Sequence, residues 1–230
     1  MKDVLGTAIS DYHNNTSTGK LWVNNKYGPK EEMPVDVYFR NMEDMPELEW
    51  VALNQCRGKT LDIGAGAGSH ALALQKMGID ITALDISPKA GDVMKKRGVE
   101  KVIHQDFWQL NEAPYDTLLL LMNGIGLCGT ITGLSRFFAK ARTLIHPGGQ
   151  LIFDSSDIAY LYDGKLPKGP EYYGEILYQY EYRRERSEWF KWLFIDRKTL
   201  TTIATREGWR TELLFEDPQD QYLVRCRPVT

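Results

Sequence analysis

The stretch Lys59-Thr-Leu-Asp-Ile-Gly-Ala-Gly-Ala-Gly-Ser-His-Ala-Leu-Ala-Leu74 constrains the fold more than any other part of the sequence. An apolar run, Leu61–Ile63, leads into three alternating glycines, after which apolar residues recur at helical spacing. The pattern predicts a strand, a tight loop and a helix. Gly64, Gly66 and Gly68 permit sharp turns and expose bare backbone, so that N–H groups at the start of the helix can bind a nucleotide-like ligand.

The spacing of these glycines separates two classes of ligand. A dinucleotide fingerprint, G-x-G-x-x-G, requires its third glycine at position 69, where this chain has Ser69. The chain instead has G-x-G-x-G, with Asp62 two residues before the first glycine. With that acid, the loop resembles motif I of the class I S-adenosylmethionine-dependent methyltransferases. A glycine-rich loop that only turns a corner is the structural alternative.

Strands and helices alternate from residue 59 to 154, which predicts an α/β fold with a doubly wound, mainly parallel Rossmann-like sheet. The second strand ends at Asp85, whose carboxylate is placed to bind two ribose hydroxyls, or else to cap the next helix. The third strand ends at Asp106 and Phe107. The resemblance implies that this acid contacts the adenine amino group, and a turn-capping aspartate is the alternative.

The fourth strand, Tyr115 to Met122, is continuously apolar and opens into a glycine-containing loop that begins with Asn123. Loops at the carboxyl ends of parallel strands bind ligands, so we expect this loop to lie near the reactive sulfonium. The predicted cofactor-binding residues are Asp62, Gly64, Ala65, Gly66, Gly68, Asp85, Ile86, Asp106, Phe107, Met122 and Asn123.

Candidate acceptor residues lie at the end of the fifth strand and in the leading segment. A helix from Gly133 to Ile145 ends in a His-Pro-Gly-Gly turn, and the strand that follows runs from Gln150 to Asp154. The polar residues after it can bind or deprotonate an acceptor, or form a hydrogen-bonded turn. The leader shows no strand and helix alternation, and its aromatic residues either contact the acceptor or pack onto the domain. The predicted acceptor residues are Tyr27, Asp154 and Asp157, with His13 as a further candidate.

We expect a single methyltransferase domain over residues 1–230. Its predicted parts are a leader over 1–57, a cofactor-binding core over 58–157, an inserted antiparallel hairpin over 158–196, and a closing helix with a C-terminal antiparallel hairpin over 197–230. The inserted hairpin would join two aromatic-rich strands through a basic turn, Arg183-Arg-Glu-Arg-Ser187, which we expect to be solvated.

Charge and composition exclude several other classes. The net charge of -3 gives no bulk attraction to nucleic acid, and no apolar run is long enough to span a membrane. Cys56, Cys128 and Cys226 are far apart and are expected to be buried, reduced thiols. The absence of a signal peptide pattern predicts a cytoplasmic location, and the sequence requires no metal.

The resemblance implies methyl transfer from S-adenosylmethionine by in-line displacement, in which alignment of the nucleophile supplies much of the rate. No catalytic residue is assigned for this reason. Adenine amino methylation needs Pro-Pro after Asn123, where the chain has Gly-Ile, and cytosine C5 methylation needs Pro before a cysteine, whereas Cys128 follows Leu127. The expected acceptor is a small molecule. A non-enzymatic binder of S-adenosylmethionine or S-adenosylhomocysteine, a nicotinamide-dependent oxidoreductase and a macromolecular acceptor remain as alternatives.

Overall fold

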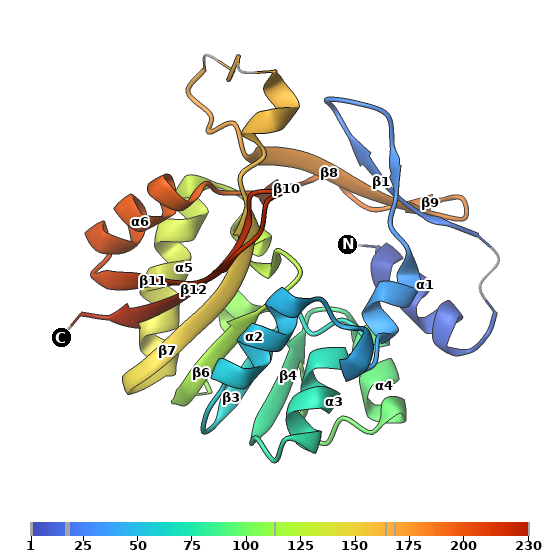
Figure 1. Cartoon of the computed structure of the whole chain (residues 1–230). Coiled ribbons are helices and arrows are strands. Elements are labelled where there is room, and N and C mark those ends of the chain that lie inside the picture. The colour runs from blue at the N-terminus through green and yellow to red at the C-terminus, as the bar shows by residue number, and fades with distance from the viewer. Residues whose placement is uncertain (1, 17–18, 113, 164, 168, 230) are drawn as a thin grey trace. The chain divides into compact units, whose positions relative to one another are not determined.

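The computed structural model describes residues 2–16, 19–112, 114–163, 165–167 and 169–229 (Figure 1). The chain divides into two compact units, and each is built from three separate segments of sequence. The first unit contains Met1–Met45, Leu61–Leu110 and Leu177–Phe190. The second unit contains Pro46–Thr60, Asn111–Ile176 and Lys191–Thr230.

The first unit contains the predicted strands and helices around the glycine loop. Its strands β3, β4 and β5 are neighbours in this order, and β4 pairs with β5 in parallel, with Asp85 opposite His104. The strands β3 and β4 are buried along almost their whole length, as expected for strands covered on both faces. The bounds of these elements are β3 (Thr60–Ile63), α3 (Ser69–Lys76), β4 (Ile81–Asp85), α4 (Pro88–Arg97), β5 (Val102–His104) and the 3₁₀ helix η3 (Phe107–Gln109).

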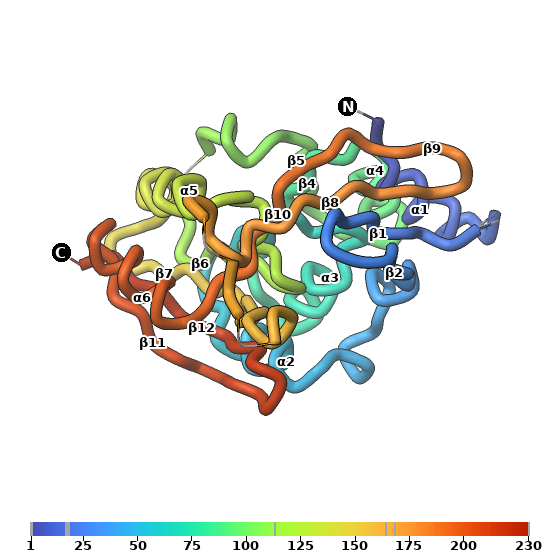
Figure 2. Tube along the Cα trace, turned by 90° about the horizontal axis from the view of Figure 1, so that it is seen from above, coloured from blue at the N-terminus to red at the C-terminus, as the bar shows by residue number. Residues whose placement is uncertain are grey.

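The leader also belongs to the first unit, and it is more regular than the sequence indicated. Figure 2 shows β1 beside β8, and the two strands pair antiparallel, with Leu21 opposite Tyr182. The helix α1 is capped by Asp3 and packs against α4 through buried Val4 and Ile9. The elements are α1 (Val4–His13), β1 (Leu21–Asn25), β2 (Glu31–Glu32), η1 (Val35–Phe39), η2 (Met42–Asp44), β8 (Glu175–Tyr182) and β9 (Glu185–Arg186). The expectation of a leader without strand and helix alternation was therefore wrong.

Four strands of the second unit are neighbours in the order β11-β12-β7-β6. The strands β6 and β7 are parallel, whereas β7, β12 and β11 are paired antiparallel. The elements are α2 (Glu47–Gln55), β6 (Tyr115–Leu120), η4 (Gly124–Cys128), α5 (Ile131–Leu144), β7 (Ile145–Ser156), η5 (Ala159–Tyr162), β10 (Phe190–Leu193), α6 (Arg197–Arg206), β11 (Trp209–Glu216) and β12 (Gln221–Pro228). The parallel pairs and the β11–β12 hairpin confirm the predicted fold class.

The helix α5 buries one apolar face against the sheet of the second unit. Its buried residues include Leu134, Phe137 and Phe138, which confirms the helical periodicity of this segment. The strand β7 begins at Ile145, directly after α5, rather than after a turn. Between the pairs Tyr115–Ile145 and Thr117–Gln150 the register shifts, so the predicted Pro-Gly-Gly turn is accommodated as an irregularity inside β7.

The three cysteines are free thiols and are buried, as predicted. Within the described residues, no helix combines the length and hydropathy that a membrane-spanning helix requires.

Candidate cofactor and acceptor site

The glycine loop joins β3 to α3 through three left-handed backbone positions in the first unit. Gly64, Gly66 and Gly68 have φ values of +78°, +58° and +82°, a region in which residues with a β-carbon are disfavoured. The N–H groups of Gly64 and Ala65 donate to the Leu84 carbonyl at 2.9 and 3.1 Å, which fixes the loop to β4. No heavy atom outside the neighbouring residues lies within 4 Å of where a β-carbon of Gly64 would be, so this side of the loop is open.

Asp85 connects the end of β4 to the glycine loop. One carboxylate oxygen accepts the Gly66 N–H at 2.8 Å and the other accepts the Ser87 N–H at 2.8 Å. Burial raises the pKa of this carboxyl, and the two backbone N–H groups act in the opposite direction. The helix α4 is capped by Ser87, whose hydroxyl accepts the Ala90 N–H, so Asp85 does not act as the helix cap. Each carboxylate oxygen retains a lone pair with which it can accept a ligand hydroxyl.

Two tyrosines, Tyr38 and Tyr180, lie close to this carboxylate, and no sequence pattern predicts this proximity. Burial raises the pKa of both Tyr38 and Tyr180, and the negative charge of Asp85 contributes to the increase. Both phenols therefore keep their protons. The Tyr38 ring also lies against the glycine loop, because a β-carbon on Gly66 would stand 3.0 Å from its Cδ1 atom.

Arg97, near the end of α4, is a further residue that the sequence analysis missed. Its guanidinium donates to the backbone carbonyls of Ala67 at 2.6 Å, Tyr38 at 3.3 Å and Phe39 at 3.4 Å. The same group lies over the Phe39 ring, 4.9 Å from its centroid. The hydroxyl of Ser69 donates to the Tyr38 carbonyl at 2.7 Å. These contacts fasten the leader to the glycine loop within the first unit.

The other predicted cofactor residues of the first unit lie in different surroundings. Asp62 is buried in β3, and Phe107 is buried in η3. Asp106 accepts the Trp108 N–H at 3.0 Å and caps η3, which is the turn-capping contact weighed above as its alternative role. Ile86 follows Asp85 and is 65% exposed, so it leaves a large apolar side chain in solvent beside the carboxylate.

In the second unit, β6 is followed by an unusual backbone turn at Met122 and Asn123, whose φ values are +59° and +54°. The Asn123 N–H donates to both oxygens of Asp154, at 3.0 and 2.9 Å. The Asn123 side chain accepts the Ser155 hydroxyl at 2.9 Å and donates to the Leu193 carbonyl at 3.2 Å. Asp154 is fully buried, and burial raises the pKa of its carboxyl to about 6.

The remaining acceptor candidates make local contacts. Asp157 accepts the Ala159 N–H at 2.9 Å and the Tyr173 hydroxyl at 2.7 Å, which forms the hydrogen-bonded turn weighed above. Tyr27 is 62% exposed. The His13 ring is stacked 6.3 Å from the Phe39 ring. Their contact with an acceptor stays a prediction.

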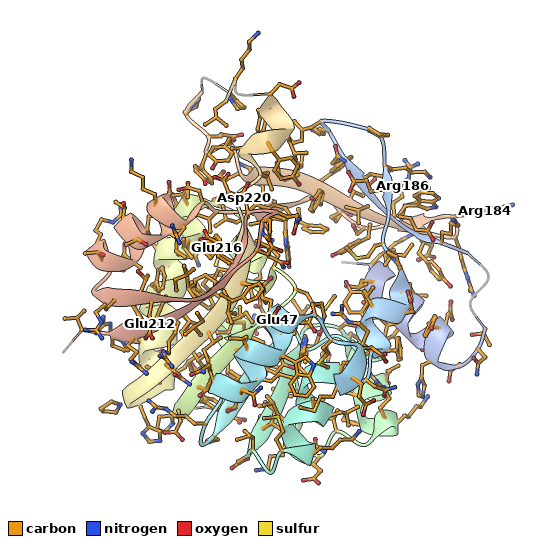
Figure 3. The ribbon with its side chains drawn as sticks, viewed as in Figure 1. Glu47, Arg184, Arg186, Glu212, Glu216 and Asp220 are labelled. Carbon is orange, nitrogen blue, oxygen red and sulfur yellow. The ribbon has the colours of Figure 1, made fainter. Side chains whose placement is uncertain are left out.

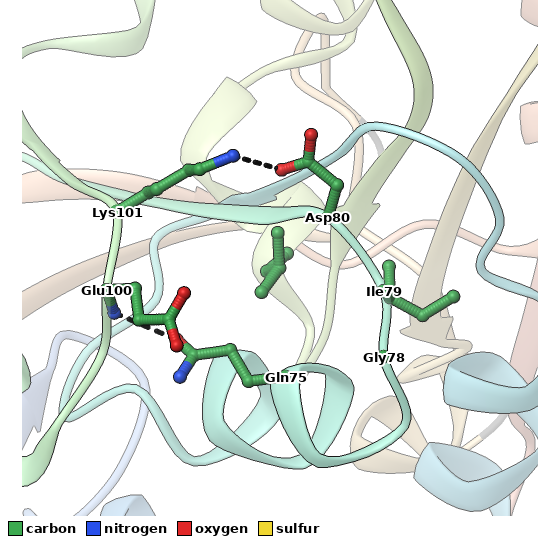
Figure 4. A pocket seen from close by; sticks show the side chains of 7 residues that line it. Gln75, Gly78, Ile79, Asp80, Glu100 and Lys101 are labelled. Carbon is green, nitrogen blue, oxygen red and sulfur yellow. Dashed lines mark hydrogen bonds and ion pairs between the residues drawn. The ribbon is translucent and has the colours of Figure 1, made fainter.

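A separate hollow of about 300 Å³ lies at the beginning of β4, the end opposite to Asp85 (Figure 4). The polar side chains that line it bind other lining residues. The Lys101 ammonium pairs with Asp80, and the Gln75 side chain accepts the Glu100 N–H at 2.9 Å. Among the described residues, no group of three or more His, Cys, Asp or Glu residues could hold a metal ion.

Comparison with known structures identifies the family. The crystal structure of an S-adenosylmethionine-dependent methyltransferase from Bacteroides fragilis in complex with S-adenosyl-L-homocysteine matches this chain with a TM-score of 0.93 and 38% identity. The match covers 100% of this chain and 96% of that one. This chain belongs to the class I S-adenosylmethionine-dependent methyltransferases. Its cofactor is S-adenosylmethionine, as the resemblance of its glycine loop implied, and the nicotinamide-dependent alternative is set aside.

Three further comparisons agree with the fold of this methyltransferase. The family described as "Methyltransferase domain" matches residues 61–153. The DhpI-SAM-HEP complex matches with a TM-score of 0.63 and 18% identity, covering 99% of this chain and 100% of that one. The sugar N-methyltransferase KedS8 from a Streptoalloteichus species matches with a TM-score of 0.56 and 16% identity, covering 87% and 96%. No curated protein sequence matches this methyltransferase.

Proposed function

We propose that this methyltransferase transfers the methyl group of S-adenosylmethionine to a small-molecule acceptor. A lone pair of the acceptor nucleophile forms a bond to the methyl carbon while the carbon–sulfur bond breaks. The bonding pair returns to sulfur, which neutralises the sulfonium and releases S-adenosylhomocysteine. Alignment of the nucleophile at about 3 Å from the methyl carbon accounts for much of the rate, so no side chain is assigned as a general base.

The ion pairs of the basic turn between β8 and β9 support a small-molecule acceptor rather than a nucleic acid. Arg183 pairs with Asp11 at 2.8 Å, and Arg186 pairs with Glu181 at 2.8 Å. The basic segment Arg183–Ser187 includes this turn and β9 itself, and Figure 3 labels Arg184 of the turn and Arg186 of β9. Because neighbouring acids compensate two of its three arginines and the net charge of the chain is -3, this turn offers little attraction to a nucleic-acid backbone.

The proposed cofactor contacts follow the motif positions. In the first unit, N–H groups of the glycine loop and the Asp85 carboxylate bind the cofactor, and the exposed Ile86 side chain offers an apolar surface to the adenine ring. Asp106 and Phe107 bind the adenine edge. In the second unit, Met122 and Asn123 contact the sulfonium end through their backbone. The division into a leader, a cofactor-binding core, an inserted hairpin and a closing hairpin is part of the same proposal.

Methyl-labelled S-adenosylmethionine tests the acceptor class directly. The protein is incubated with labelled cofactor and a cell extract that has been separated into small molecules, proteins and nucleic acids. We expect label only in the small-molecule fraction, and none with Asp85→Ala, which removes the proposed ribose ligand. Transfer into protein or nucleic acid would refute the small-molecule proposal. Titration with S-adenosylhomocysteine and NADH, for which only the former should bind, verifies the cofactor site independently.

A further inference from the structure

The backbone after β6 adopts a conformation that its sequence does not favour. Met122 and Asn123 are consecutive non-glycine residues with φ of +59° and +54°. In this left-handed region the β-carbon crowds the backbone, and residues other than glycine occupy it mainly one at a time. Two such residues in succession need strong support from the surrounding structure.

Asp154 provides that support from the neighbouring strand β7. Both of its oxygens accept the same Asn123 N–H, at 3.0 and 2.9 Å, and the Gln221 side chain of β12 donates to one of them at 3.1 Å. The carboxylate is completely buried, so these contacts are made without competition from water. A charged acceptor forms a stronger hydrogen bond to a backbone N–H than a neutral one does.

The Asn123 side chain is held as firmly as its backbone. Its oxygen accepts the Ser155 hydroxyl and its nitrogen donates to the Leu193 carbonyl. Ser155 in turn accepts the Ile195 N–H at 3.1 Å. Because protein groups bind the amide at both ends, its orientation is set by the fold, and we assign this turn a role through its backbone.

We propose that Asp154 is a positioning residue, whose buried carboxylate holds Met122 and Asn123 in the left-handed turn that presents their backbone to the cofactor. This role rests on the proposed cofactor contact of these two residues. In this role Asp154 acts through the backbone of Met122 and Asn123, whereas the sequence analysis predicted that it contacts the acceptor directly.

The charges around Asp154 determine how its role depends on pH. Burial raises its pKa to about 6, and Glu49 of α2 acts in the same direction. The Asn123 N–H and the Gln221 side chain lower it, and the neutral phenol of Tyr222 on β12 also faces this carboxylate. The carboxylate is therefore charged at pH 7.5 and becomes protonated below about pH 6. Protonation removes the charge that holds the Asn123 N–H.

Calorimetric titration with S-adenosylhomocysteine between pH 5 and 8 tests this role. At pH 7.5, Asp154→Asn should bind about tenfold more weakly than wild type, as the loss of a charged hydrogen bond requires. The wild-type affinity should fall below pH 6 by more than that of the variant. Asp116→Asn is the matched control, because Asp116 also accepts a backbone N–H, that of Lys59 at 2.8 Å, but at the opposite end of β6. Its affinity and pH profile should equal those of wild type.

A folded Asp154→Asn that binds with wild-type affinity and the wild-type pH profile would overturn the proposal. If this variant does not fold, Ser155→Ala is the second test, because it removes the hydroxyl that holds the Asn123 side chain, together with that hydroxyl's contact to the Ile195 N–H, and leaves Asp154 in place. Ser155→Ala should weaken binding at least about threefold, and wild-type affinity would count against the proposal. If wild type itself fails to bind S-adenosylhomocysteine, the proposed cofactor site is wrong, and this distinguishes its failure from that of the Asp154 role alone.

Discussion

A pair of glycine substitutions can separate backbone strain from loss of the cofactor. Gly64, in the glycine loop, and Gly78, in the turn before β4, both have φ of +78°. Neither has a heavy atom within 4 Å of the position that a β-carbon would occupy. Gly64→Ala and Gly78→Ala therefore introduce the same strain and no internal clash. They differ in that only Gly64 belongs to the loop proposed to bind the cofactor.

The expected loss of stability is the same for both variants. An alanine held in the left-handed region costs about 1–2 kcal/mol. For a chain of this size, that corresponds to a decrease in melting temperature of about 2–8 °C. The β-carbon at position 64 would in addition occupy the open side of the loop. If one backbone hydrogen bond to the cofactor is lost as a result, affinity falls by about tenfold.

Urea unfolding and calorimetric titration with S-adenosylhomocysteine measure the two effects separately. We expect equal free energies of unfolding for the two variants, and weakened binding in Gly64→Ala alone. Equal affinity in both variants would show that the open side of Gly64 does not face the cofactor. A much larger loss of stability in Gly64→Ala would show that the loop is packed more tightly than the structure indicates.

Two further predictions concern Arg97 and Asp154. Arg97→Met should lower the free energy of unfolding by about 2–4 kcal/mol in urea denaturation, because three backbone carbonyls lose a charged donor while the apolar stem is kept. The exposed control Arg206→Met should change it by less than about 1 kcal/mol, and equal losses would contradict the role of Arg97 as a clamp. For Asp154 the native pKa of about 6 lies above the ordinary 3.8, so its contribution to stability is greatest below pH 3.8 and is lost as pH rises through 6. The free energy of unfolding of wild type relative to Asp154→Asn should therefore decrease by about 2 kcal/mol between pH 4 and 7, and a constant difference would refute the raised pKa.

Local patterns were sufficient to predict much of the strand, loop and helix arrangement of the first unit. The glycine spacing gave the strand, loop and helix around Gly64, and the buried strand ending at Asp85 was visible as an apolar run. The helix α5 was equally clear, because its apolar residues recur over fourteen residues. Short-range periodicity is a strong signal when an element is long or is bounded by glycine.

The remaining features depend on contacts that are distant in the sequence. The helix α1 buries only a few small or medium side chains, and its close approach to α4 depends on Gly6, where a β-carbon would stand 2.1 Å from the Ser87 hydroxyl. The partner of β1 lies more than 150 residues away, so no local pattern predicts their pairing. The left-handed turn at Asn123 could not be predicted from the local sequence either, because Asp154 on another strand stabilises it.

The pairing of β1 with β8 has a consequence for the synthesis of the chain. Leu21 faces Tyr182 in this ladder, so the leader leaves the ribosome long before its partner strand has been translated. A nascent chain that ends at residue 157 already contains the glycine loop and Asp85, but its β1 edge on this side is still unpaired. Unpaired strand edges favour association between chains. The first unit can therefore complete its fold only late in translation. Until then, a chaperone that covers the unpaired edge of β1 would prevent association between nascent chains.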